Sequence, residues 1–224
     1  MIEGSPQEIA IEMFKEIGSV ERILDIGCGD GKVAEQLKKL GLSQGIYGVD
    51  MDEKLLNKAK EKGIEVYRVD LENEKLPFPD NFFDVVLCID VIEHIVNIYH
   101  LLSEIKRVLK SNGFLIVSTP NVRFIYHIIR LILGYGPKTS FNPSEYYGAD
   151  LYDGGHVHYF TIKDLRNLLI RYGFKLLEVR GTYNVGLYVV RGLSKFASKT
   201  KIFYNYLCPG IVTMAINIKN VLEK

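Results

Sequence analysis

The sequence lacks an excess of charge of either sign. Among its 224 residues, 28 Lys and Arg stand against 27 Asp and Glu, which leaves a formal net charge of +1 at pH 7. A protein that binds nucleic acid carries a basic face, and binding here would need a local patch that the composition does not indicate. We therefore expect no nucleic-acid partner.

Cysteine is scarce, and the three cysteines are Cys28, Cys88 and Cys208. Their number is odd, they lie far apart and none belongs to a C-x-x-C pair, so the pattern favours a reducing compartment over a disulfide framework. The N-terminus also lacks the basic stretch and apolar run of a secretory signal. We expect a cytoplasmic protein.

A long uninterrupted apolar run is missing as well. The longest stretch without a charged residue lies between Lys201 and Lys219, and Pro209 and Gly210 in its middle would break a membrane-spanning helix. The remaining composition, 47% hydrophobic and 25% charged, is that of a globular chain with a sizeable core. We therefore expect a globular chain without a transmembrane span.

Short strand patterns alternate with helix patterns along most of the chain. Strands are predicted over 22–26, 46–49, 64–69, 82–89, 114–118, 174–179 and 212–218, and helices over 5–18, 32–40, 53–62, 95–110, 122–135, from 161 onward and over 187–197. Such alternation predicts a parallel sheet with helices on both faces, and the apolar run 82–89 predicts a central strand. A short helix before the last strand stays open. No linker or repeat divides the chain, so we expect one domain, 1–224.

Glycines gather in the turn after the first predicted strand, Leu24-Asp25-Ile26-Gly27-Cys28-Gly29-Asp30-Gly31. This turn lies at the carboxyl end of the sheet, where doubly wound folds bind ligands. A dinucleotide fingerprint, G-x-G-x-x-G, would place its third glycine where Lys32 stands, so the spacing argues against NAD. Asp50 ends the second predicted strand, where a carboxylate can accept from both hydroxyls of a ribose. An adenosine-bearing ligand therefore fits.

These residues resemble the class I S-adenosylmethionine-dependent methyltransferases, in particular the broad group that includes ubiquinone-biosynthesis O-methyltransferases. The matching segments cover roughly residues 20 to 180 and are 24–31, Asp50, Val69-Asp70-Leu71, Phe83-Asp84-Val85-Val86 and Asp90-Val91-Ile92-Glu93-His94. The resemblance implies an α/β, doubly wound Rossmann-like fold. Its sheet would be mostly parallel, with seven strands in the order 3-2-1-4-5-7-6 and the last strand antiparallel. It also implies S-adenosylmethionine as cofactor and methyl transfer to a small-molecule acceptor.

The resemblance assigns the matching positions to parts of the cofactor. Asp25 would orient the methionine part, against which the turn residues Gly27, Cys28, Gly29 and Gly31 would lie. Asp90 and Val91 would border its methyl end. Asp50 would hold the ribose, and Asp70 would accept from the adenine amine between Met51 and Leu71. Simpler roles stay open, because Asp25 and Asp50 could cap the following helices and Asp70 could be a plain loop carboxylate.

Three histidines, His94, His156 and His158, are candidates for a catalytic base. A neutral imidazole near the methyl group could remove the proton of a hydroxyl or phenol, and we expect transfer to oxygen. Each histidine could instead be a hydrogen-bonded structural residue. His156 and His158 could form a metal site with the acidic residues near them, and Glu93 and His94 could join this site in space. The sequence offers no second cluster of metal ligands at suitable spacing. We therefore assign no metal.

The segment 122–159 is predicted to be an inserted helical lid over the acceptor. Its apolar residues between 124 and 133 would pack on the body, line an acceptor pocket or touch a membrane. In the tail, Arg191, Lys195, Lys199 and Lys201 stand among apolar residues, which permits peripheral contact with anionic lipid or ordinary core packing. An apolar or lipid-linked acceptor is one hypothesis. The alternative function is that of a non-catalytic, S-adenosylmethionine-binding regulatory protein.

Overall fold

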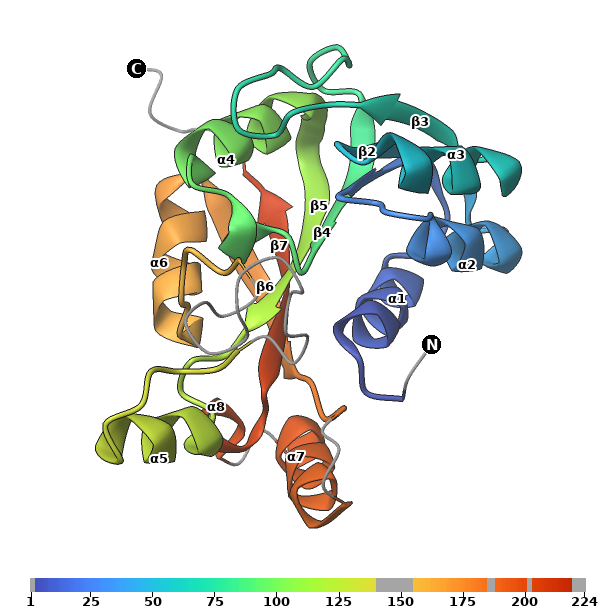
Figure 1. Ribbon diagram of the computed structural model, residues 1–224. Helices are drawn as coiled ribbons and strands as arrows, with labels where there is room; N and C mark the ends of the chain where they lie inside the picture. Colours follow the sequence, from blue (N-terminus) through green and yellow to red (C-terminus); the bar gives the residue numbers. More distant parts are fainter. Residues whose placement is uncertain (1–2, 140–154, 185–187, 201–202, 219–224) are drawn as a thin grey trace.

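A seven-stranded sheet occupies the centre of the molecule in this computed structural model, which describes residues 3–139, 155–184, 188–200 and 203–218 (Figure 1). The strands are β1 (Val20–Ile26), β2 (Ser43–Asp50), β3 (Glu65–Arg68), β4 (Phe83–Ile89), β5 (Leu109–Pro120), β6 (Phe174–Gly181) and β7 (Gly210–Asn217). Their order is β3-β2-β1-β4-β5-β7-β6; β7 runs antiparallel to both β5 and β6, and the other neighbouring pairs among the described strands are parallel. This order and direction confirm the fold that the resemblance implies.

Helices cover both faces of this sheet. They are α1 (Pro6–Ile17), α2 (Lys32–Leu40), α3 (Glu53–Glu61), α4 (Ile98–Val108), α5 (Ile125–Ile132), α6 (Ile162–Arg171), α7 (Tyr188–Thr200) and α8 (Tyr204–Leu207), with a 3₁₀ turn, η1 (Ile92–His94), after β4. Along β4, Val86 and Cys88 join the core beneath α4 and α6, whereas Val85 and Leu87 join the core beneath α1 and α2. Because successive side chains of a strand point to opposite faces, β4 is buried on both, as its sequence predicts.

Two helices are shorter than their sequence patterns predict. The pattern over 95–110 forms α4 only from Ile98, because the side chain of Asn97 caps the helix by accepting from the amide of His100 at 3.2 Å. It ends at Val108 because Leu109 already pairs with Phe83 in the sheet. The pattern over 122–135 forms α5 only over 125–132, and the predicted short helix before the last strand is α8.

Helices α5, α7 and α8 gather at one end of the molecule, beyond the carboxyl ends of β5 and β6 (Figure 1). On α5 and just after it, Ile129, Ile132 and Leu133 are 50%, 79% and 65% exposed, so of the three alternatives for this segment these side chains do not follow packing on the body. Phe124 and His127 are the buried residues of this segment. Residues 140–154 of the predicted lid lie outside the described part. Within that part, none of the helices combines the length and the apolar character needed to cross a membrane.

Candidate active site

The glycine turn after β1 is pinned to the end of β2. The amides of Gly27 and Cys28 donate to the carbonyl of Val49 at 2.8 and 3.0 Å, and the amide of Gly29 donates to the carboxylate of Asp50 at 2.8 Å. Gly27 has φ +67°, and a Cβ at this position would lie 2.4 Å from Cγ2 of Val91. A side chain at this position would collide with Val91, which lies two residues after the end of β4, so glycine lets the ends of β1 and β2 approach the segment after β4 closely.

Asp25 and Asp50 lie next to this turn in different environments. Asp25 is 3% exposed, and its Oδ2 atom has no hydrogen-bond partner in the described part of the chain. Burial, and then the nearby charge of Asp50, raise the pKa of Asp25 to about 7. Both oxygens of Asp50 accept from backbone amides, those of Gly29 and Asp52, but each oxygen keeps a further lone pair for another donor.

The residues predicted to bind adenine follow β2 and β3. A hydrogen bond from the amide of Val69 to the carbonyl of Asp50, 3.1 Å long, holds the two strand ends side by side. The carboxylate of Asp70 accepts from the side chain of Asn73 and from the amide of Glu72, and these bonds keep the pKa of Asp70 below its usual value. These two hydrogen bonds are those expected of a carboxylate that stabilises its own loop, which was the alternative to binding adenine. Met51 is exposed and Leu71 packs against the core, so their contacts with adenine stay predictions.

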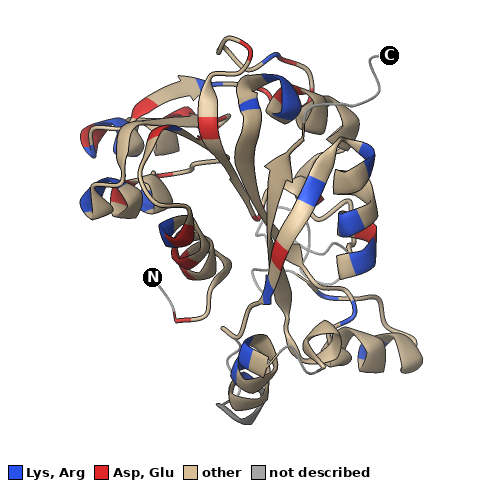
Figure 2. Ribbon diagram, turned by 180° about the vertical axis from the view of Figure 1, so that it is seen from behind, with Lys and Arg blue, Asp and Glu red and all other residues tan. Residues whose placement is uncertain are grey.

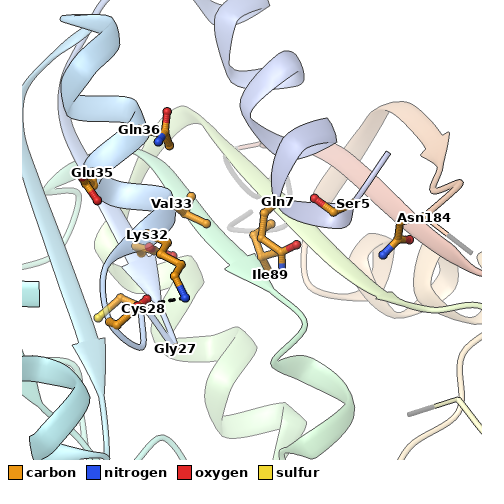
Figure 3. A pocket seen from close by; sticks show the side chains of 12 residues that line it. Ser5, Gln7, Gly27, Cys28, Lys32, Val33, Glu35, Gln36, Ile89 and Asn184 are labelled. Atoms are coloured by element: carbon orange, nitrogen blue, oxygen red, sulfur yellow. Dashed lines mark ion pairs between the residues drawn. The ribbon is translucent and has the colours of Figure 1, made fainter. Parts of the chain in front are cut away.

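A cavity of about 640 Å³ lies between the glycine turn and the start of α1 (Figure 3). The turn contributes Asp25, Gly27 and Cys28 to its wall. Its other lining residues come from helices, strand ends and loops: Ser5, Gln7, Asp30, Lys32, Val33, Glu35, Gln36, Ile89 and Asn184. Lys32 pairs with Asp30 at 3.1 Å (Figure 3). Gln7, Lys32 and Asn184 were not predicted as site residues, because no motif in the sequence marks them.

Asp90 lies just beyond β4, at the position that the resemblance assigns to the methyl end of the cofactor. It has φ +55°, and its carboxylate accepts from the hydroxyl of Ser118 at 2.6 Å and from Nε2 of Gln7 at 3.1 Å. Burial raises the pKa of Asp90 despite these bonds. Val91 follows it and contacts the glycine turn through the space above Gly27.

A second cavity, of about 520 Å³, adjoins the first. The two cavities share Gln7 and Asn184, so whatever fills the second lies beside whatever fills the first. Its remaining lining residues are Pro6, Asp90, Glu93, His94, Thr119, Pro120, Thr139, His156, Thr182, Pro209 and Gly210. Most of the residues on the described wall have polar side chains, and they include two of the three histidines predicted to act on the acceptor.

The rings of His94 and His156 are in contact although the two residues are far apart in the sequence, and their ring centroids lie 4.6 Å apart. Backbone bonds bring them together, because the amides of Val157 and His158 both donate to the carbonyl of Glu93, at 2.9 and 3.1 Å. The ring of His158 instead lies 6.1 Å from that of Phe160, centroid to centroid, and His158 is not among the residues that line the second cavity. Its role as a base stays a prediction.

Glu93 lies beneath these two histidines with its side chain almost fully buried. It is 1% exposed, and neither carboxylate oxygen makes a hydrogen bond of ordinary length and angle within the described part of the chain, although the hydroxyl of Thr119 lies near enough to lower its pKa slightly. Burial, and then the charge of Asp90, raise the pKa of Glu93 to about 8. The sequence singles out Glu93 only as the neighbour of His94, because the burial of one glutamate cannot be predicted from its residue type.

Comparison with known proteins decides the family. The sequence profile of the methyltransferase domain family matches residues 4–179. The chain belongs to this family. It is a class I S-adenosylmethionine-dependent methyltransferase, which confirms the resemblance. The ubiquinone biosynthesis O-methyltransferase of Rickettsia canadensis (strain McKiel) is 32% identical over 171 residues, 70% of this chain and 69% of that protein. A protein of the same name from Rickettsia conorii is 31% identical over 73% of this chain and 59% of its own length.

Solved structures agree with the fold of this methyltransferase. An S-adenosylmethionine-dependent methyltransferase from Mesorhizobium loti superposes with a TM-score of 0.63 at 18% identity, over 95% of this chain and 98% of the other. Membership of the methyltransferase family, rather than the shared fold, makes S-adenosylmethionine the cofactor. The first cavity fits the methionine part of the cofactor chemically, because Asp25 lines it with an oxygen that has no partner among the described residues and could attract a positive charge. Asp50, Met51, Asp70 and Leu71, which are predicted to hold the ribose and adenine, are not among the residues that line this cavity.

Proposed function

We propose that this methyltransferase transfers the methyl group to a hydroxyl oxygen of a small-molecule acceptor that occupies the second cavity. The observation that carries the proposal is that His94 and His156 line the second cavity, which shares Gln7 and Asn184 with the first cavity, where the donor would bind. Imidazoles are the side chains best suited to handle a hydroxyl proton near neutral pH. Two relatives named for O-methylation in ubiquinone biosynthesis support a small-molecule acceptor with such a hydroxyl.

The bound cofactor supplies a methyl group on a sulfonium, so no covalent intermediate with the protein is needed. The chain has to hold the donor, align the acceptor with the methyl group and exclude water from both. Asp25, the glycine turn and Asp50 hold the donor, and Gln7 keeps Asp90 in place at the boundary with the acceptor. His94 has one ring nitrogen, Nδ1, 3.3 Å from the carbonyl of Gly155. Because a carbonyl can only accept, Nδ1 carries the proton and Nε2 is left to act on the acceptor.

We further propose that only the reacting end of the acceptor is polar. Most side chains on the described wall of the second cavity are polar, yet the loops that border it lead to the apolar end of the molecule: Pro120 precedes α5, and Pro209 follows α8. On that end Ile132, Leu133 and Phe196 are at least half exposed. An apolar or lipid-linked acceptor could place its hydroxyl in the cavity and its tail along these helices.

Peripheral contact with a membrane forms part of this proposal. Lys and Arg occur on α5 and α7 without any Asp or Glu (Figure 2). Two of these cations are already paired, because Arg191 and Lys195 both contact the carboxylate of Glu3. The contact therefore depends on the exposed apolar side chains more than on attraction to anionic lipid. The buried, unpaired thiols support a reducing, cytoplasmic setting.

The test is a product analysis with methyl-deuterated S-adenosylmethionine and a panel of hydroxylated aromatic compounds, each with and without a long alkyl chain. We expect a labelled methyl ether and an equal amount of S-adenosylhomocysteine by mass spectrometry, with the alkylated compounds preferred. His156→Gln should lower turnover by about 10²-fold or more without changing affinity for S-adenosylhomocysteine, whereas His100→Gln, outside both cavities, should match the wild type. Methylation at carbon or nitrogen would contradict the proposal.

Binding of the donor without turnover on any acceptor would favour the alternative, a non-catalytic regulatory protein. That outcome would leave the donor site intact and would remove the role proposed for the second cavity.

A further inference from the structure

Lys32 carries the only positive charge among the described residues that line the first cavity. Asp25 lines the same cavity, and one oxygen of its buried carboxyl group has no partner in the described part of the chain. The methionine part of S-adenosylmethionine carries both an ammonium and a carboxylate group, and one acidic and one basic side chain would complement them. We propose that Lys32 binds this carboxylate and makes the site selective for donors that carry it.

The turn that precedes Lys32 places it at the cavity. Lys32 is the first residue of α2 and directly follows Gly31, which has φ +74°. A Cβ on Gly31 would lie 2.7 Å from Cδ1 of Ile64 and 2.9 Å from Cβ of Ala59, so the end of the glycine turn packs closely against α3 and the loop after it. The backbone at Lys32 is therefore fixed, and its ammonium group lies beside the glycine turn (Figure 3).

The present partner of Lys32 does not depend on it. Nζ of Lys32 lies 3.1 Å from Oδ2 of Asp30, but Nζ of Lys62 lies 3.7 Å from the same oxygen and donates to the carbonyl of Asp30 at 2.6 Å. Asp30 therefore keeps a positive neighbour when Lys32 turns towards a ligand. The side chain of Lys32 is 75% exposed, so it can move, and an exposed ion pair of this kind contributes little to stability.

The remaining charge on this part of the wall is balanced from outside the cavity. Glu35, one turn further along α2, pairs with Lys39 at 2.6 Å and with Lys62 at 3.7 Å, and neither lysine is among the residues that line the cavity. The start of α2 has no side-chain cap, so the free amides of its first turn add to the positive potential around Lys32. A carboxylate is therefore attracted to the start of α2.

The two charged contacts together orient the donor. Asp25 and Lys32 would each hold one charged group of the same amino-acid unit, which limits the rotation of that unit and fixes the direction of the attached methyl group. The bound ligand also removes water from around Lys32, and a charge-assisted hydrogen bond is stronger there than on an open surface. A ligand without the carboxylate forfeits this contact while it keeps the ammonium group that Asp25 attracts.

The test compares two ligands by calorimetric titration of the full chain. They are S-adenosylhomocysteine and its decarboxylated analogue, which differ only in the carboxylate. We expect the wild type to bind S-adenosylhomocysteine about tenfold or more tightly than the analogue, and Lys32→Met to bind both ligands about as weakly as the wild type binds the analogue. Lys32→Arg should keep the preference. Lys39→Met is the matched control, because it removes the same charge from the same helix outside the cavity and should keep the wild-type ratio.

A preference that Lys32→Met retains in full would overturn the proposal, since another group would then bind the carboxylate. An equal loss of affinity for both ligands in this variant would also overturn it, because Lys32 would then act only on the structure of the site. No acceptor takes part in the measurement, so the result is independent of the proposed O-methylation. Absence of binding of either ligand by the wild type would remove the donor site, and the role of Lys32 with it.

Discussion

The buried carboxyl group of Asp25 should make donor binding depend on pH. With a pKa of about 7, Asp25 is largely neutral in mildly acidic solution and ionised above neutrality. The donor and its product carry an ammonium group on the methionine part, which an ionised carboxylate attracts and a neutral carboxyl does not. Affinity for S-adenosylhomocysteine should therefore rise with pH and level off above about pH 7.5.

The size of this effect follows from the titration of one group. At pH 5.5 a group with a pKa near 7 is about 3% ionised, so affinity should be about thirty-fold lower than on the plateau if only the ionised form binds well. Stability should change in the opposite direction. Because the pKa is raised on folding, ionisation of Asp25 destabilises the fold as pH rises from about 4 to about 7, by up to about 4 kcal/mol.

Calorimetric titration with S-adenosylhomocysteine from pH 5.5 to pH 8 measures this dependence on the wild type and on Asp25→Asn. We expect the variant to bind weakly and with no dependence on pH, and to be more stable than the wild type at pH 8 in urea unfolding. A wild-type affinity that does not change over this range would refute the reasoning. So would a variant with the same pH dependence, since another group would then be responsible.

Three further predictions follow from local geometry. Gly27→Ala would place a Cβ 2.4 Å from Val91 at a residue with a left-handed φ, and should lower the free energy of unfolding by more than Gly41→Ala. Gly41 has nearly the same φ but open space around it, so its replacement should cost about 1–2 kcal/mol. Urea unfolding measures both costs, and equal values would contradict the close approach of Val91 to Gly27. The three cysteines are buried, and burial raises each thiol pKa, so a thiol reagent at pH 8 should react only after unfolding, and rapid reaction of any one would be contrary to the structure. Replacing Ile132 and Leu133 together by Glu should reduce co-sedimentation with vesicles without changing donor affinity, and unchanged sedimentation would exclude α5 from membrane contact.

The sequence predicts the sheet well because its signals are local and repeated. Apolar runs such as 82–89 alternate with amphipathic segments, and the glycine turn follows the first strand at the place where such folds bind ligands. The strand order itself came from the resemblance, since periodicity alone does not say which strands are neighbours. Helix ends were less predictable, because α4 begins where Asn97 caps it rather than where the apolar pattern starts.

The candidate site is less visible in the sequence because it is assembled from distant segments. His94 and His156 meet only because the chain after the insertion bonds to the carbonyl of Glu93. Gln7 and Asn184 line both cavities although neither belongs to a motif. Apolar character likewise does not distinguish packing from exposure, which is why the sequence leaves packing, an acceptor pocket and a membrane open for the apolar side chains of α5, several of which are exposed.

The most direct measurement of the central claim is a calorimetric titration of the full chain with S-adenosylhomocysteine, repeated on Asp50→Ala and on Asp52→Ala. Asp50 contacts the glycine turn, whereas Asp52 caps α3 by accepting from the amide of Lys54. We predict one molecule bound per chain, an affinity about tenfold or more weaker in Asp50→Ala because charge-assisted hydrogen bonds to the ribose are lost, and no such loss in Asp52→Ala. No binding by the wild type, or equal affinities in all three proteins, would contradict the account.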